Sequence, residues 1–327
     1  MTHPHRGLEI AAFLDQNGWG AAEAQAFDGD FSSRRYARLV RADGVTAILM
    51  DADPDQKTSQ FVGVAGLLRK YGVTAPEMIA ADAAHGLVLM QDFGVRNIGA
   101  LIDVGNEAAP FYLRAAGVLA KLHNGFDRGE ELDLDLPLFN TDLFVTQVEL
   151  FLDAWFPFIQ GRAASEEERQ DFRAAWRAVL RPMEVMPKSL MLRDFMPDNL
   201  MDLANGETGV LDFQDAGIGP VAYDMASLCE EVRRDGGFAL LPPVIAYYRE
   251  RAQSSLSEAD LTRACIILSA QRHTRILGII AQRVVKTGRR DKLDFAPRIQ
   301  THLNHIMKET YLLPVREWMD GFKGLLS

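Results

Sequence analysis

The segment from residue 188 to residue 213 constrains the chain more than any other part of its sequence. It reads KSLMLRDFMPDNLMDLANGETGVLDF, in which short apolar runs flank Asp194, Asn199 and Asp212. Asp212 follows Asp194 by 18 residues and Asn199 by 13, which leaves room for one tight β-hairpin. We therefore expect a fold in which a single hairpin brings two carboxylates and one amide close together.

An aspartate followed five residues later by an asparagine is a spacing used in phosphoryl transfer. The aspartate accepts a proton from an attacking hydroxyl, and the asparagine carbonyl holds a metal ion on the nucleotide phosphates. The metal-binding aspartate belongs on the strand after this loop, so the strand GVLDF (209–213) favours Asp212 over Asp92, despite the DFG at 92–94. A carboxylate that ends a buried strand also costs desolvation unless a cation offsets it. The alternative for Asp212 is a residue that caps the hairpin.

The length and composition of the chain indicate a globular protein with two lobes. At 327 residues it is too long for one small core. Hydrophobic residues make up 48% of it and charged residues 24%, as in ordinary globular domains. The 35 Lys and Arg against 45 Asp and Glu give a formal net charge of -10, a field that repels nucleic acid and anionic membranes. Neither is expected as a partner, and the oligomeric state is not readable from the sequence.

Three further features bear on the compartment. Cys229 and Cys265 each lie in an apolar stretch, so we expect buried free thiols rather than a disulfide or a zinc site. The most apolar later stretch, 264–285, is interrupted by Gln271, Arg272, His273, Arg275, Gln282 and Arg283. Such interruptions are typical of a core helix and not of a membrane span. The N-terminal segment MTHPHRGLEIAAFL lacks the apolar core of a secretory signal. The expected location is the cytoplasm.

The first ninety or so residues predict a small antiparallel sheet with one helix packed against it. Residues 36–41 and 45–50 are β-rich, and the Asp43-Gly44 pair between them is a hairpin signal. The other elements expected in this part are a helix over 58–70 and two strands within 73–82 and 86–94.

Beyond residue 94 the chain is predicted to be mainly helical. Pro110 suits the first position of a helix that runs to His123. Two helix starts carry capping boxes, Ser165 with Glu168 and Ser257 with Asp260. We therefore expect an α+β fold with a β-rich N-lobe over residues 1–93 and a helical C-lobe over 94–327 that contains the catalytic hairpin and the acceptor pocket.

Five segments, in this order, resemble the aminoglycoside phosphotransferase family, whose fold is similar to that of protein kinases. They are GDFSSRRYARL (29–39), LVLMQDFG (87–94), LAKLH (119–123), LRDFMPDNLM (192–201) and VLDFQDAGIGPVAYDMASL (210–228). The last segment is the most specific. Within the family, the likeness is to the branch of anomeric N-acetylmuramate/N-acetylglucosamine kinases. The resemblance implies a bilobal, protein-kinase-like fold.

The resemblance also implies roles for single residues. Asp194 becomes the catalytic base, and Asn199 and Asp212 become Mg²⁺ ligands, with ATP as the phosphoryl donor. Asp224 is similar to a buried aspartate that braces the catalytic loop through backbone amides. Asp215 is a weaker candidate for a second metal ion or for the acceptor sugar.

Two segments are implied to bind the nucleotide. Residues 90–92 correspond to the hinge between lobes, whose backbone pairs with adenine, and residues 29–35 to the loop over the phosphates. The side chains and backbone expected to contact ATP are those of Gly29, Ser32, Ser33, Arg34, Arg35, Met90, Gln91 and Asp92. Glycine allows close backbone approach, serines donate to phosphate oxygens, and arginine forks match phosphate geometry. The alternative for residues 34–38 is a solvated edge strand.

Two cations usual in such enzymes are missing. The strand lysine is replaced by Met50, the helix over 58–70 has no glutamate, and Met196 stands two residues after the base. A transferring phosphoryl group needs its charge met. We expect arginine to supply that charge, with the candidates Arg34, Arg35, Arg38 and Lys57; otherwise the enzyme is weak or silent.

The leading hypothesis is an ATP- and Mg²⁺-dependent kinase that acts on a hydroxyl of a small molecule, with an amino sugar as the expected acceptor. The alternatives are an aminoglycoside-antibiotic phosphotransferase, a catalytically weak nucleotide-binding protein, and a protein kinase, for which the segment from Asp215 to Pro220 leaves no activation loop. No G-x-x-x-x-G-K-[ST] occurs. His302 and His305 have a spacing that could bind metal, but no third ligand is near in sequence, so a solvated helix face is favoured.

Overall fold

A hairpin at Asp43-Gly44 begins the sheet of the N-terminal part, as predicted. The computed structural model describes residues 4–27, 34–53, 57–127 and 134–326. Strands β2 (Arg35–Val40) and β3 (Thr46–Asp51) pair antiparallel, with Tyr36 opposite Met50. Gly44 has a φ of 81°, a left-handed conformation that glycine adopts without steric cost.

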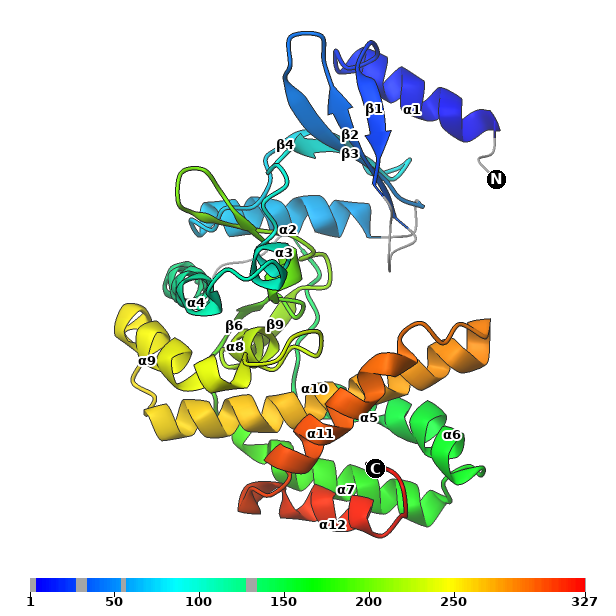
Figure 1. Ribbon diagram of the computed structural model, residues 1–327, viewed down its shortest axis with the longest axis vertical. Helices are drawn as coiled ribbons and strands as arrows, with labels where there is room; N and C mark the ends of the chain where they lie inside the picture. The colour runs from blue at the N-terminus through cyan, green and yellow to red at the C-terminus, as the bar shows by residue number, and fades with distance from the viewer. Residues whose placement is uncertain (1–3, 28–33, 54–56, 128–133, 327) are drawn as a thin grey trace. The chain divides into compact units, whose positions relative to one another are not determined.

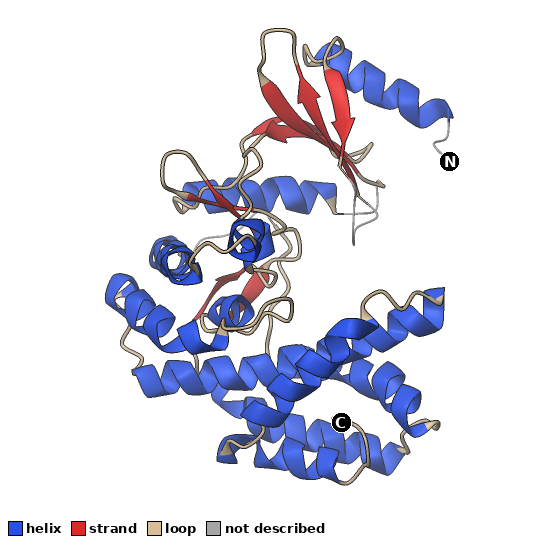
Figure 2. Ribbon diagram, viewed as in Figure 1, coloured by secondary structure: helices blue, strands red, loops and turns tan. Residues whose placement is uncertain are grey.

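Three more strands complete an antiparallel sheet, whose strands are red in Figure 2. They are β1 (Glu23–Ala26), β4 (Met78–Asp82) and β5 (Leu87–Gln91). The strand order is β1-β2-β3-β5-β4. The predicted strands β2 to β5 are confirmed, whereas β1 was not predicted.

One face of the sheet packs against a helix that was not predicted either. Helix α1 (Pro4–Gln16) lies beside the sheet in Figure 1. Phe13 of α1 and Trp19 after it form an apolar cluster with side chains of alternate strand positions, namely Leu39, Ala47, Leu49, Leu87 and Leu89. The expectation of a single helix against the sheet was therefore wrong, because the apolar positions of α1 (Ile10, Phe13, Leu14) mark only a short amphipathic stretch.

The opposite face carries the alternate residues of the same strands. Cross-strand pairs on this face are Tyr36 with Met50, Arg38 with Ile48, and Ile48 with Met90. Helix α2 (Thr58–Lys70) has the predicted bounds, and Phe61, Val64, Ala65 and Leu68 are buried on one side of it. On this face Arg38 therefore lies beside the apolar residues Ile48 and Met90. A charged side chain among apolar ones makes this face a candidate ligand-binding site.

The chain divides into two units. The first comprises Met1–Glu107, Asp127–Asp135 and Pro197–Ala216, and the second Ala108–Phe126, Leu136–Met196 and Gly217–Ser327. The first unit contains the whole predicted N-lobe together with the central hairpin, formed by β7 (Leu200–Asp202) and β8 (Thr208–Val210).

Backbone hydrogen bonds join this hairpin to the rest of the first unit. Val210 N–H donates to the carbonyl of Thr74, and Asp202 N–H to that of Arg96, at 2.9 and 2.8 Å. Asn97, which caps helix α3 (Ile98–Asp103), also donates its side-chain amide to the carbonyl of Asp198 at 2.5 Å.

The second unit is built around one long helix. Helix α10 (Glu258–Thr287) contains the predicted core helix of 264–285, and its contacts include four other α-helices. These are α5 (Thr141–Leu150), α8 (Tyr223–Cys229), α9 (Leu241–Ala252) and α11 (Ala296–Ile306), the last of which crosses α10 in Figure 1. The remaining long helices are α4 (Ala108–Gly125), α7 (Glu166–Leu180) and α12 (Leu313–Asp320).

Several smaller predictions can be checked in this unit. Both capping boxes are confirmed, at Ser165 and Ser257. Pro110 is the third residue of α4 rather than its first, so that prediction was wrong by two residues. Cys229 and Cys265 are buried free thiols, as predicted. Among the described residues, no helix has both the length and the apolarity needed to cross a membrane.

A short two-stranded sheet completes the second unit. Strand β6 (Lys188–Met191) pairs with β9 (Gly217–Pro220), which was not predicted. A Cβ at Gly217 would lie 2.5 Å from the Pro137 carbonyl, so the close approach here requires glycine. The loop that begins at Leu192 therefore leaves a fixed strand.

Candidate active site

A cavity of about 550 Å³ lies within the first unit. Its walls come from the polar-bearing face of the sheet and from the central hairpin. The residues that line it include Tyr36, Arg38, Ile48, Met90, Gln91, Asp92, Asn199, Met201, Leu211 and Asp212. The structure thus places the predicted hinge residues and both predicted metal ligands around one cavity.

Asn199 and Asp212 are neighbours at the edge of this cavity. The Asn199 side-chain amide donates to Asp212 Oδ2 at 3.3 Å, and Gln214 Nε2 donates to Asp212 Oδ1 at 2.7 Å. Strand β8 ends at Val210, and Asp212 has a left-handed backbone with φ 58°. An aspartate in this sparsely populated region is held there by its surroundings.

One step of the sequence argument for Asp212 was wrong. The side chain is exposed, not at the end of a buried strand, so desolvation gives no reason to expect a cation. The donor set itself still fits Mg²⁺, which takes one or two protein oxygens together with substrate phosphates and water. The carboxylate of Asp212 and the amide oxygen of Asn199 are ligands of that kind.

Asp92, in the literal DFG, has its carboxylate occupied by other protein groups. Arg38 donates to it from Nε and Nη2 at 2.6 and 3.0 Å, and Gly94 N–H donates at 2.8 Å. Burial alone raises the pKa of Asp92, but the hydrogen bonds from Arg38 and Gly94 outweigh it and leave the pKa below its usual value. Asp92 is therefore an ionised partner for Arg38 in the wall of the cavity.

The candidate phosphate-binding cations differ in the residues with which they form ion pairs. Arg35 is 57% exposed and pairs with Asp51 at 2.8 Å, as does Arg6 at 2.6 Å. Lys57 lies 3.5 Å from Asp215. Arg38 is held by Asp92, as described above. Arg35, Arg38 and Lys57 therefore each have a carboxylate partner.

Arg34 is the fourth candidate cation. It is 7% exposed, and its guanidinium lies 5.8 Å from the ring centre of Phe61. Burial raises the pKa of Tyr36, and Arg34 and Asp212 act on the same hydroxyl with opposite effects. Arg34 is therefore close to the Asp212 end of the cavity. Met50 is fully buried and supplies no polar atom there. Gly29, Ser32 and Ser33 lie outside the described residues.

Asp194 belongs to the second unit, and its side chain is 41% exposed. Arg272 of α10, whose side chain is 4% exposed, places Nη2 3.6 Å from Asp194 Oδ1. Sequence reasoning missed Arg272. The available signal was the run Gln271, Arg272, His273 inside an otherwise apolar helix, because buried polar residues in a core helix need partners.

Asp224 braces the loop that carries Asp194. It is buried, and its carboxylate accepts hydrogen bonds from the amides of Leu192 and Arg193 at 2.7 and 2.8 Å. Ser227 Oγ donates to the Arg193 carbonyl at 3.0 Å. These bonds hold Arg193 in a left-handed conformation, with φ 73°. Burial raises the pKa of Asp224 to about 7, against the opposing effect of the two amides.

Comparison with solved structures identifies the class of fold. A choline/ethanolamine kinase family protein from Mesorhizobium loti aligns with a TM-score of 0.66 at 14% identity, covering 95% of this chain and 99% of that one. An amicoumacin kinase, solved in complex with AMP-PNP, Ca²⁺ and Ami, aligns with a TM-score of 0.64 at 13% identity, covering 95% of both chains. The fold is thus α+β and protein-kinase-like, as predicted.

The sequence comparisons identify the family. The model of the phosphotransferase enzyme family (APH) matches residues 23–261, and the chain belongs to this family. An N-acetylmuramate/N-acetylglucosamine kinase of Caulobacter vibrioides is 28% identical to this chain, and the matched region covers 95% of each of the two chains. One of Pseudomonas aeruginosa is 30% identical over 93% of this chain and 92% of its own. The predicted resemblance is confirmed, and the protein is a phosphotransferase of the small-molecule kinase type.

We predict that Asp224→Ala destabilises the protein more than Ser227→Ala does. The first change leaves two buried amides without an acceptor, at about 1–3 kcal/mol each, whereas the second removes one neutral hydrogen bond worth about 0.5–1.5 kcal/mol. Denaturant unfolding of both variants measures the difference.

The penalty of Asp224→Ala should also depend on pH. With a folded-state pKa of about 7, the native carboxyl retains a proton that the unfolded chain releases above its ordinary pKa. This contribution to stability is present at low pH and is lost as pH rises through 7, so the penalty grows from pH 8 to pH 5. A penalty that stays the same from pH 8 to pH 5 would instead show that the carboxylate is ionised throughout this range.

Proposed function

We propose that this phosphotransferase transfers the γ-phosphoryl group of ATP to a hydroxyl of an N-acetylated amino sugar in a Mg²⁺-dependent reaction. The observation that carries the proposal is the pair of Asn199 and Asp212 at the edge of the cavity that residues 90–92 also line. The names of the relatives, which are N-acetylmuramate/N-acetylglucosamine kinases, support this acceptor class.

The cavity suits an adenine nucleotide in size and in chemistry. Ile48, Met90, Met201 and Leu211 offer apolar surface to a purine, while Asn199 and Asp212 offer oxygens at one side. The backbone N–H of Gln91 already donates to the Glu77 carbonyl at 2.8 Å, so this N–H does not contribute to binding adenine. The amicoumacin kinase of similar fold, solved with AMP-PNP and Ca²⁺, supports a nucleotide–metal complex in such a fold.

The proposed step is an in-line displacement. The acceptor hydroxyl oxygen forms a bond to the γ-phosphorus, the bond from that phosphorus to the bridging oxygen breaks, and ADP leaves. Asp194 accepts the hydroxyl proton. Asn199 and Asp212 would hold Mg²⁺, which would offset the charge on the phosphates. Arg272 fixes the Asp194 carboxylate from the buried side.

The surroundings of Asp194 favour a neutral or anionic acceptor. Arg193, Arg272 and Arg275 form a cationic group around Asp194. Their proximity is seen at Arg275: burial and the charges of Arg193 and Arg272 lower its pKa, while the charge of Asp194 raises it. Arg272 Nη1 is buried and has no hydrogen-bond partner among the described residues. Such a field repels a polycationic aminoglycoside but accommodates an amino sugar, and it attracts the carboxylate of N-acetylmuramate.

A second candidate function is nucleotide binding without efficient turnover. Met50 favours it, because this fully buried side chain stands where a strand lysine would meet the phosphates. Turnover measurements on the variants below separate the two functions.

We predict that Asp212→Asn weakens Mg²⁺-dependent ATP binding by about ten-fold or more, because an anionic oxygen ligand is lost. Thermal-shift titration with ATP and Mg²⁺, repeated with EDTA, measures the effect. Asp202→Asn is the matched control, since Asp202 lies on the same hairpin and pairs with Arg96 instead. If Asp212→Asn retains the full Mg²⁺-dependent stabilisation, the metal assignment is wrong.

Arg34 is the cation that we expect to replace the missing lysine. Arg34→Ala should lower turnover by the equivalent of about 2–4 kcal/mol of barrier, the scale of one charged contact to the transition state. Arg35→Ala, which removes one of the two arginine partners of Asp51, should leave turnover nearly unchanged. Steady-state kinetics of the two variants test this assignment, and equal effects would contradict it.

Asp194→Asn should lose about 10²–10⁴-fold of turnover while it still binds ATP. Asp198→Asn, with the same charge change in the same loop, is the control. Purified protein with ATP, Mg²⁺ and N-acetylmuramate or N-acetylglucosamine should yield ADP and a sugar phosphate. Turnover of kanamycin-like acceptors alone would instead assign the antibiotic-modifying branch, and tight ATP binding without any turnover would assign the silent binder.

A further inference from the structure

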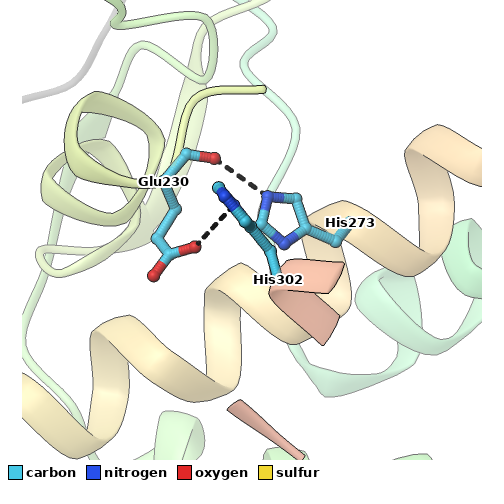
Figure 3. Close-up of side chains that lie close together, drawn as sticks. All are labelled: Glu230, His273 and His302. Atoms are coloured by element: carbon cyan, nitrogen blue, oxygen red, sulfur yellow. Dashed lines mark hydrogen bonds and ion pairs between the residues drawn. The ribbon is translucent and has the colours of Figure 1, made fainter. Parts of the chain in front are cut away.

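Three side chains of the second unit that the proposed reaction does not use lie close together. Glu230 directly follows α8, His273 lies in the middle of α10, and His302 lies on α11. One ring nitrogen from each histidine and one carboxylate oxygen of Glu230 are all within 4.8 Å of one another. Figure 3 shows the three side chains converging from their separate elements.

The hydrogen bond of His273 fixes which of its nitrogens carries the proton. His273 Nε2 lies 2.9 Å from the Glu230 carbonyl oxygen, which can only accept, so Nε2 is the donor (Figure 3). In a neutral imidazole with its proton on Nε2, the lone pair lies on Nδ1. Histidine ligands of metal ions commonly donate their other N–H to a carbonyl in this way.

Each of the three residues also has a buried polar atom without a hydrogen-bond partner among the described residues. These atoms are Glu230 Oε1, His273 Nδ1 and His302 Nδ1. The last lies 3.5 Å from Glu230 Oε2, too far for a well-formed hydrogen bond. An ion pair of Glu230 with His302 would still leave His273 Nδ1 and Glu230 Oε1 unsatisfied, which is costly in a buried cluster.

We propose that Glu230, His273 and His302 bind one divalent transition-metal ion, Zn²⁺ in the first place. Two imidazoles and one carboxylate are a donor set that suits Zn²⁺, whereas Mg²⁺ prefers oxygen ligands. Ligand atoms in a tetrahedral zinc site lie roughly 3.4 Å apart. The separations here, all within 4.8 Å, therefore have to shorten by at most about 1.4 Å on binding. A cavity of about 250 Å³, lined by Glu230 and His302, gives room for a water molecule as the fourth ligand.

The site differs from the pair of histidines that the sequence singled out. His305 is exposed, packs edge-on against Phe238 with 5.3 Å between ring centres, and is not part of the cluster. His302 finds its partners on α10 and after α8, far away in sequence. His305 lines the same small cavity, which makes it a matched control for His302.

The test is zinc binding by the full-length, untagged protein after metal removal. Equilibrium dialysis against micromolar ZnCl₂ followed by elemental analysis should find one zinc ion per chain. His302→Ala should lower the affinity at least about ten-fold, and His305→Ala should not change it. Asp212→Asn should also bind zinc normally, which separates this site from the proposed Mg²⁺ site.

Two further measurements keep the result decisive. Co²⁺ in place of Zn²⁺ should give the visible absorption bands of a four-coordinate site, absent from His302→Ala. Glu230→Gln, which retains the side-chain shape, should weaken binding in the same direction if His302→Ala folds poorly. Absence of stoichiometric zinc, or equal losses in the His302 and His305 variants, would overturn the proposal.

Discussion

The candidate site depends on the backbone of one short segment, which is held in unusual conformations at both ends. Arg193 and Asp212 both adopt left-handed φ values, and neither is glycine. Asp224 and Ser227 fix the first end through the amides and the carbonyl of the loop. At the second end, the hairpin is joined to residues 74 and 96 by main-chain hydrogen bonds. Strain that is maintained in this way positions side chains that local preference would not.

Much of this arrangement could be predicted from the sequence because it is local. The Asp43-Gly44 turn, the helix over 58–70 and the two capping boxes each depend on residues a few positions apart. The same holds for the spacing of Asn199 and Asp212, whose side chains meet across one hairpin. The role of Asp224 followed from the family resemblance, and its contacts with the two loop amides fit that role.

The missed features have a different physical origin. Strands β1 and β9 are four residues each and weakly patterned, so only pairing with β2 and β6 makes them strands. Arg272 lies 78 positions after Asp194, and no local sequence pattern indicates that the two side chains are in contact. The cluster of Glu230, His273 and His302 likewise forms only when three helices pack. The exposure of the Asp212 side chain also could not be predicted from the sequence, because it depends on the turn that follows β8.

Adjacent residues of α10 face two different polar centres. Arg272 reaches Asp194, while His273 bonds to the carbonyl of Glu230. A helix cannot rotate one of these side chains without displacing the other, since successive positions share one rigid backbone. If an acceptor binds beside Asp194 and a metal ion binds at His273, as proposed above, an ion that displaces α10 would also displace Arg272 and change acceptor affinity. By linkage the acceptor would change the affinity for that ion by the same factor, so that the two centres would form a reciprocal pair.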